Sequence, residues 1–289
     1  MPPDLLTRLS PPLFVVLWAT GFVVARLVAP HADPLTFLFV RFVIAALLLA
    51  AFAAAVRAPW PATRNGWRDG FVAGILLHGG YLGAVFWAVK HGLPAGVAAL
   101  VAGLQPLATG FLVGPALGER VSPRRWLGIA VGALGAGLVI GPKLGLPDGV
   151  PAGPLAVCFG GMLSITIGTV WQKRTGAAAD LRTNTAVQYV GAAALVGPLA
   201  LLTETGRLDP TPALAAGLLW SVFGMSIGAV GLLMLLIRRG AVAGVAALLY
   251  LVPPVSALMA FGLFGETLSP LQIAGMAVAA LGVAVASRG

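Results

Sequence analysis

Apolar stretches long enough to cross a lipid bilayer recur along the whole chain, and they constrain its fold more than any other feature. A transmembrane α-helix needs about 20 consecutive, mainly apolar residues. The 289-residue chain is 59% hydrophobic and only 9% charged, whereas an ordinary globular domain has about 25% charged residues. Its mean hydropathy is +0.97. The sequence therefore predicts an all-α polytopic membrane protein.

Proline, glycine and charged residues interrupt these stretches and divide the chain into ten apolar segments. The gaps between the segments are short, so we expect no separate soluble domain, and any binding site should lie within the helix bundle. We expect transmembrane helices near residues 12–29, 35–56, 70–89, 94–116, 124–141, 153–172, 183–202, 213–237, 241–263 and 270–286.

The basic residues predict which side of the membrane each gap faces. If the N-terminus is cytoplasmic, 13 of the 18 Lys and Arg residues lie on the cytoplasmic side, four lie on the other side (Arg26, Lys90, Lys143 and Arg207), and Arg41 lies inside a span. Because Lys and Arg are retained in cytoplasmic loops, both termini are expected in the cytoplasm. Arginine outnumbers lysine 15 to 3, which is typical of a GC-rich bacterial gene. We therefore expect a multi-pass protein of the bacterial inner membrane.

Charge and motifs argue against several functions. The formal net charge is +9, but the basic residues are spread over the gaps and not clustered as in a nucleic-acid binder. No G-x-x-x-x-G-K-[ST] motif is present, so the chain has no P-loop for ATP hydrolysis. No Asp or Glu lies near the centre of a span, which argues against a carboxylate proton relay and against a membrane enzyme. We expect no cofactor and no metal site, since no second His or Cys is suitably spaced near His78.

The second half of the chain repeats the first. The segment GERVSPRRWLG at 118–128 corresponds to GETLSPLQIAG at 265–275, at an offset of 147 residues. The segment GVAALVAGLQP at 96–106 corresponds to GVAALLYLVPP at 244–254, at an offset of 148. The same local turn is thus written twice, and the first copy alone is rich in arginine.

Each copy is expected to hold five helices, over residues 1–145 and 146–289. Because five is odd, the two copies would cross the membrane in opposite senses. Inverted repeats of this kind build many secondary transporters, whose substrate site lies near the midplane where the halves meet. A duplicated pore or scaffold is the alternative. The missing arginines of the second copy agree with inversion, since its turn would face away from the cytoplasm.

Polar and aromatic residues inside the spans are candidates for a substrate site, since a polar group is costly within the bilayer. We assign substrate binding to Trp18, Thr20, Arg41, His78, Tyr81, Gln105, Ser164, Trp171, Gln188 and Tyr250. A single Trp or Tyr more often belongs to packing or to an interfacial belt. His78 either binds substrate or relays a proton, or it is satisfied by a neighbouring helix. Arg41, whose repeat mate is Gln188, either snorkels to the far interface or meets a substrate carboxylate.

Prolines occupy matching positions in the two repeats, at Gln105-Pro106 in the fourth span and at Pro253-Pro254 in the ninth. Proline removes a backbone hydrogen bond and kinks a helix, and freed carbonyls at membrane depth are tolerated where they face a cavity. We expect these kinks to line a central cavity and to act as gating points. A purely structural bend is the alternative.

Glycines are frequent in the fifth and tenth spans, and Gly128 and Gly132 form a G-x-x-x-G motif. Small residues allow helix backbones to approach closely. The motif does not specify an oligomer, so the oligomeric state is left open, with a monomer as one possibility.

Together these features resemble the drug/metabolite transporter superfamily, in its EamA-type branch. The resemblance covers the whole chain and is carried by LWATGFVVAR at 17–26 and by the paired P…GE..SP…..G segments. It implies a basket-like fold around a central cavity, cytoplasmic termini and export of metabolites. LWATGFVVAR and Tyr81 are most similar to the YddG-like members, which export amino acids. Gln105 stands where such exporters can place an aromatic residue, so small polar amino acids are expected substrates as well as aromatic ones.

The sequence therefore favours a secondary exporter of amino acids or similar small metabolites that works by alternating access. Its partners would be the small-molecule substrate and the lipid bilayer. An exporter of drugs or of sugar- or nucleotide-like metabolites, and a passive metabolite channel, are the alternatives. Counterflow separates a carrier from an open pore, because substrate on the far side accelerates uptake only by a carrier.

Overall fold

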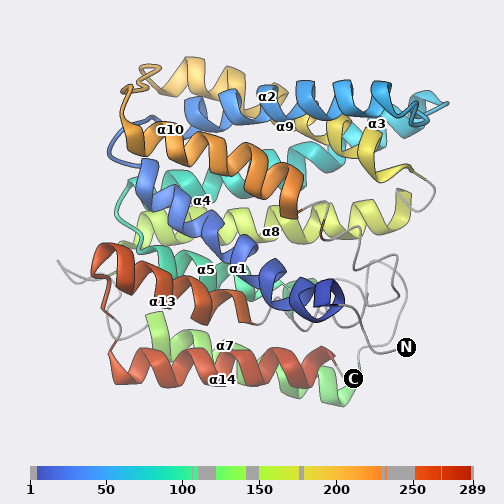
Figure 1. The fold of residues 1–289 in the computed structure, drawn as a ribbon. Coiled ribbons are helices and arrows are strands. Elements are labelled where there is room, and N and C mark those ends of the chain that lie inside the picture. The colour runs from blue at the N-terminus through green and yellow to red at the C-terminus, as the bar shows by residue number, and fades with distance from the viewer. Residues whose placement is uncertain are drawn as a thin grey trace. The chain divides into compact units, whose positions relative to one another are not determined.

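The computed structural model describes residues 5–105, 107–109, 122–140, 150–175, 179–229, 232, 251–267 and 269–287. Every regular element in these residues is a helix (Figure 1). The described residues contain one β-type pairing, an isolated antiparallel bridge between Ala32 and Leu208. The α-helices are α1 (Leu5–Val28), α2 (Pro34–Ala55), α3 (Arg64–Gly74), α4 (Tyr81–Lys90), α5 (Ala95–Gly103), α7 (Pro123–Ile140), α8 (Ala152–Thr175), α9 (Leu181–Thr203), α10 (Pro212–Leu219), α13 (Val252–Phe264) and α14 (Pro270–Ser287). Two π-helical segments, η1 (Ile75–Gly80) and η3 (Trp220–Ala229), continue α3 and α10.

The helices have the length and composition of a multi-pass membrane protein. Five are long and apolar enough to cross a membrane: Pro34–Ala55, Arg64–Lys90, Ala152–Thr175, Leu181–Thr203 and Pro212–Ala229. Five shorter apolar helices are Pro12–Val28, Ala95–Thr109, Trp126–Val139, Val252–Phe264 and Pro270–Gly282. Each expected span overlaps one of these segments, and the count of ten spans stays a prediction.

The third span begins six residues earlier than expected, at Arg64 instead of residue 70. Thr63 caps this helix, and its hydroxyl oxygen accepts a hydrogen bond from Gly66 N at 3.1 Å. Such a cap satisfies one of the free N–H groups of a first helical turn. The polar run from 64 to 69 therefore forms the start of α3, although its composition is typical of a loop.

The helices form two compact units, and each unit combines segments from both halves of the chain. Unit 1 comprises Met1–Val24, Gly92–Ala156 and Gly228–Gly289; unit 2 comprises Ala25–His91 and Val157–Ile227. The expected repeats, 1–145 and 146–289, divide the sequence and do not coincide with the compact units. The difference arises because helices far apart in sequence pack together, as α2 does with α9 and α7 with α14 (Figure 1).

Helix bounds recur at a spacing of 147 residues. Adding 147 to the bounds of α1, 5 and 28, gives 152 and 175, which are the bounds of α8. The same shift takes α7 (123 and 140) to α14 (270 and 287). It takes α2 (34 and 55) to 181 and 202, one residue before the end of α9. Local structure thus recurs at the offset of the sequence repeat.

In unit 1, α7 and α14 approach each other through glycines. A Cβ added at Gly135 would lie 2.3 Å from the backbone nitrogen of Ala279, and one added at Gly282 would lie 2.2 Å from that of Gly132. Gly135 and Gly282 occupy matching repeat positions, as do Gly132 and Ala279. The two contacts are therefore equivalent under exchange of the repeats. Close packing at these glycines is what small residues permit.

In unit 2, Glu204 joins the end of α9 to the start of α2. Its two carboxylate oxygens accept hydrogen bonds from the backbone nitrogens of Leu35 and Thr36, each at 2.8 Å. The first N–H groups of a helix lack partners and carry partial positive charge, so a carboxylate stabilises them. Because the start of one helix meets the end of the other, α2 and α9 pack antiparallel.

Candidate substrate-binding site

The third span widens in the middle of the bilayer-length segment Arg64–Lys90, where η1 separates α3 from α4. Short π-helical segments disturb the regular backbone ladder and are frequent at functional sites. The hydroxyl of Ser164 on α8 donates a hydrogen bond to the carbonyl of Leu76 at 2.8 Å, which satisfies one acceptor of this segment. At its start, Gly74 brings α9 very close, since a Cβ there would lie 1.9 Å from Gln188 O. The widened turn carries His78.

His78, Gln188 and Arg41 form a polar cluster in unit 2, in which Arg41 and Gln188 are buried and His78 is half-buried. His78 Nε2 lies 3.1 Å from Gln188 Oε1, a hydrogen bond between η1 and α9. Arg41 on α2 is 3% exposed and Gln188 is 4% exposed. Arg41 lies near enough to interact electrostatically with His78 and Tyr189. Three helices of the unit therefore contribute polar groups to one buried region.

Aromatic rings enclose this cluster. The Tyr189 ring stacks on Phe42, with 5.7 Å between centroids and 17° between planes, and its centroid lies 4.8 Å from that of His78. Arg41 Cζ lies 5.8 Å from the centroid of the Phe42 ring. Phe42 and Tyr189 are repeat mates, as are Arg41 and Gln188, each separated by 147 residues. The stacked rings therefore mark a local two-fold relation between α2 and α9.

No carboxylate in the part of the chain that the structure describes forms an ion pair with the Arg41 guanidinium. Its Nε and Nη1 atoms are buried and make no hydrogen bond there. The ion pairs described for unit 2, Arg68–Asp69, Arg182–Asp180 and Arg207–Asp209, all lie at helix ends or in loops. Desolvating an unpaired charge is costly, so a partner is needed. A carboxylate ligand would supply two acceptor oxygens in the geometry that the guanidinium prefers.

The structure describes the surroundings of Arg41 and His78, for which the sequence leaves two alternatives each. Arg41 is 3% exposed, so its side chain is enclosed by protein. His78 is hydrogen-bonded by a neighbouring helix, and it lies beside the unpaired guanidinium as well. Among the described residues, no group of three or more His, Cys, Asp or Glu side chains could hold a metal ion. The chemistry available is one cation, an amide, an imidazole and aromatic faces.

Three other expected site residues lie in unit 2 but serve as helix contacts. Ser164 binds the η1 backbone as described, and Trp171 Nε1 donates to the carbonyl of Asp69 at 3.1 Å. Tyr81 is 6% exposed at the first position of α4. Ser164 and Trp171 therefore hold α8 against the third span, and the hydrogen bonds described for them do not involve Arg41.

The remaining expected residues belong to unit 1 or lie outside the described residues. Trp18 packs on Phe14 with 5.3 Å between ring centroids, and the Thr20 hydroxyl donates to Leu17 O at 2.6 Å. Gln105 Nε2 donates to Thr109 Oγ1 at 3.0 Å. Pro106 and Tyr250 lie outside the described residues.

Pro253 and Pro254 lie in the first turn of α13. Backbone N–H groups in the first turn of a helix have no acceptor within the helix. Proline, which lacks an N–H group, is therefore tolerated there. A Cβ added at Gly103 on α5 would lie 2.7 Å from Pro253 Cγ, so the proline packs tightly against α5. Their role as gating points stays a prediction.

Phe42 and Tyr189 belong to the cluster but are not among the substrate-binding residues expected from the sequence. Phenylalanine carries no polar group, so its presence in an apolar span gives no sign of a binding role. The repeat offers a signal for both residues, because they are mates at an offset of 147 and follow directly after the mates Arg41 and Gln188.

The helices have the length and composition of a polytopic membrane protein, and unit 2 holds a polar cluster. The sequence matches the EamA-like transporter family twice, over residues 13–141 and 153–288. The chain belongs to the EamA-like transporter family. It is 29% identical over 278 residues to the "Uncharacterized inner membrane transporter YedA" of Escherichia coli K12, covering 95% of this chain and 88% of that protein.

Two further proteins are similar over most of the chain. The "Probable amino-acid metabolite efflux pump" of Salmonella typhimurium LT2 is 28% identical over 277 residues, covering 91% of this chain and 88% of the relative. A solved structure titled "Crystal structure of protein" has a TM-score of 0.67 and 21% identity, covering 96% of both chains. The structural likeness supports the fold alone.

Proposed function

We propose that this protein is a secondary transporter that exports amino acids or similar small metabolites across the bacterial inner membrane. The observation that carries the proposal is the buried Arg41 guanidinium, whose Nε and Nη1 make no hydrogen bond among the described residues, near the His78–Gln188 hydrogen bond. A zwitterionic amino acid supplies a carboxylate for Arg41. Its ammonium group is suited to the Gln188 amide oxygen and to the faces of Phe42 and Tyr189.

The names of two relatives support export as the direction of transport and the inner membrane as its location. One is named an inner membrane transporter and another a probable amino-acid metabolite efflux pump. Transport, and not catalysis, also suits a site whose polar groups bind charge but form no acid–base or nucleophilic set. An exporter of drugs or of sugar-like metabolites would not require a buried arginine in its binding site, because many such ligands lack a carboxylate.

Alternating access between two inverted repeats is the proposed mechanism. The two matches to the family and the recurrence of helix bounds at 147 residues support a repeat. The antiparallel packing of α2 with its mate α9, and the stacking of the repeat mates Phe42 and Tyr189, support inversion. Repeats related in this way can exchange conformations, which opens a midplane site to each side in turn. A passive channel would not need such an exchange.

Transport assays in proteoliposomes test the function directly. A panel of amino acids, supplied with and without a pH gradient, should reveal at least one substrate whose efflux is accelerated by trans-side substrate, as a carrier requires. His78→Ala and Gln105→Ala should each reduce that rate while the protein still purifies as a folded species. Unchanged rates in both variants would remove these residues from the substrate site, and transport without trans-acceleration would indicate a channel.

Membrane topology gives a second test of the proposal. A reporter fused after Gly289 should be active on the cytoplasmic side of the membrane. The 13 basic residues expected on the same side of the membrane as the N-terminus favour a cytoplasmic N-terminus, and an even number of spans, ten, returns the C-terminus to that side. A fusion in the connection between α4 and α5, near Gly92, should report the opposite side. A periplasmic C-terminal reporter would contradict the ten-span arrangement.

A further inference from the structure

A groove of about 350 Å³ lies in unit 2, away from the polar cluster. It runs between α2, the start of α3 and α9. Its lining is apolar apart from one arginine: Ala46, Ala50, Trp60, Trp67, Arg68, Phe71, Ala186, Val187 and Val190. Alanines form its floor because α2 and α9 both present small residues there, which leaves space that larger side chains would fill.

Two tryptophans form one wall of the groove. The rings of Trp60 and Trp67 stack with 5.6 Å between centroids and 3° between planes. They are 38% and 45% exposed, so the pair is accessible from outside the helices. Tryptophan is enriched at the membrane–water interface, where its ring contacts the headgroup and acyl boundary. The groove therefore has an aromatic wall of the kind that is common where a lipid headgroup meets its acyl chains.

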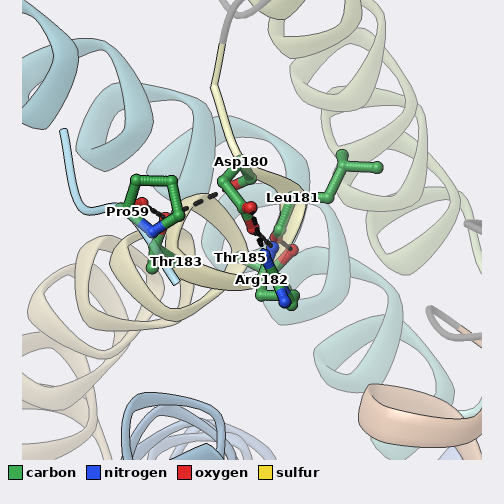
Figure 2. A network of polar contacts seen from close by, with 6 residues as sticks. All are labelled: Pro59, Asp180, Leu181, Arg182, Thr183 and Thr185. Atoms are coloured by element: carbon green, nitrogen blue, oxygen red, sulfur yellow. Dashed lines mark hydrogen bonds and ion pairs between the residues drawn. The ribbon is translucent and has the colours of Figure 1, made fainter. Parts of the chain in front are cut away.

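Hydrogen bonds hold the chain on both sides of Trp60. The Thr183 hydroxyl, at the start of α9, donates a hydrogen bond to Pro59 O at 2.8 Å (Figure 2). Trp67 Nε1 donates to Pro61 O at 2.9 Å. The connection between α2 and α3 is thus fastened immediately before and after Trp60. Such fastening means that little ordering is needed when a ligand binds.

The same start of α9 holds an ion pair in which Arg182 neutralises Asp180. Arg182 donates two hydrogen bonds to Asp180, at 2.9 and 2.6 Å (Figure 2). The hydrogen bond from the Arg182 guanidinium lowers the pKa of Asp180 to about 2. Asp180 therefore stays ionised at neutral pH and remains paired with Arg182.

Residues 57–69 carry three arginines and one aspartate, which leaves a net charge of +2. Arg68 lines the groove, and its side chain is 61% exposed while it pairs with Asp69. Arg64 lies four residues earlier on α3, so it shares the same helix face. Arg64 makes no hydrogen bond or ion pair within the described part of the chain. The apolar groove therefore opens next to positive charge that is not fully neutralised.

We propose that this groove binds an anionic phospholipid, with one acyl chain along the alanine floor and the phosphate against Arg64 and Arg68. The apolar lining requires a hydrocarbon occupant, and the arginines select an anionic headgroup. The stacked tryptophans pack against the upper part of the chain. This site is separate from the proposed substrate site, and it does not depend on what the protein transports.

Native mass spectrometry of the purified wild-type protein tests the proposal, with phosphatidylglycerol and phosphatidylcholine of identical acyl chains as probes. The first phosphatidylglycerol should bind at an about 5-fold or more lower concentration than the first phosphatidylcholine, since each basic residue near an anionic lipid contributes about that factor. Ala50→Phe should fill the groove and weaken the first binding event. The double variant Arg64→Gln/Arg68→Gln should bind the two lipids equally, while Arg174→Gln, which removes an exposed charge from the end of α8, should keep the preference.

Equal binding of the two lipids by the wild-type protein would overturn the proposal, and so would displacement of the lipid by millimolar inorganic phosphate alone. If Ala50→Phe lowers the melting temperature and prevents a clear result, Trp60→Ala in the exposed connection tests the same groove. Preserved first-lipid binding in a folded Trp60→Ala or Ala50→Phe variant would also overturn it. Each measurement is made without a transport substrate, so failure of the proposed function does not affect the outcome.

Discussion

Replacing Arg41 by glutamine or methionine should remove most amino-acid transport without lowering the stability of the protein. Arg41 is 3% exposed, and its Nε and Nη1 make no hydrogen bond within the described residues. A desolvated charge pair in a binding site is worth about 2–5 kcal/mol, so the transport rate at limiting substrate should fall at least about 30-fold. Removal of an uncompensated buried charge is neutral or stabilising, so the apparent melting temperature should stay the same or rise.

Two comparisons make the Arg41 result specific. Arg41→Lys should recover only part of the transport, because lysine cannot offer the planar two-pronged contact of a guanidinium. Arg174→Gln removes one charge from the exposed end of α8 and should leave transport near the wild-type rate. If Arg41→Met instead lowered the melting temperature by many degrees and kept transport, Arg41 would be a structural residue with a partner outside the described part of the chain.

Gly135→Ala and Gly282→Ala should each destabilise unit 1, although they add only a methyl group. The added Cβ atoms would lie 2.3 and 2.2 Å from backbone nitrogens of the facing helix, so α7 and α14 must move apart. Overpacking of this kind costs about 1–3 kcal/mol. The apparent melting temperature of the purified protein in detergent should fall accordingly. The two losses should be similar in size, because the contacts are equivalent under exchange of the repeats.

Gly137 provides the matched control on the same helix. A Cβ at Gly137 would meet nothing within 4 Å, and alanine is favoured over glycine within a helix by about 1 kcal/mol. Gly137→Ala should therefore leave the melting temperature unchanged or raise it slightly. The double variant Gly135→Ala/Gly282→Ala should cost less than the sum of the single variants, since one separation of the helices relieves both overlaps. Equal melting temperatures for Gly135→Ala and Gly137→Ala would contradict the described packing of α7 on α14.

The apolar segments and their breaks could be predicted because lipid imposes them residue by residue. Every expected span overlaps a described apolar helix. The start of the third span was wrong by six residues, since the polar run that begins α3 is satisfied by the Thr63 cap and by its own charges. Hydropathy measures the preference of a segment for lipid, but it does not detect a capped polar turn that extends a helix into the interface.

The candidate site was only partly predictable. Arg41, His78 and Gln188 were identified because a polar residue in an apolar span is costly and therefore conspicuous. Their mutual contact was not predictable, and neither was the different use of Ser164 and Trp171 as helix contacts. The helices concerned are apolar around most of their circumference, so their sequence does not reveal which face meets which neighbour.

The sequence by itself determined that the protein lies in a membrane, where most of its described helices begin and end, apart from the early starts of α1 and α3, and that its halves are related at an offset of 147. These properties depend on local composition and on duplication, which are written along the chain. Only the tertiary structure decided that Arg41 is buried with two nitrogens that make no hydrogen bond among the described residues, that Phe42 and Tyr189 stack, and that alanines leave a groove beside two tryptophans. Those properties depend on how each helix is rotated and which helix faces it, and side-chain packing between distant segments sets both.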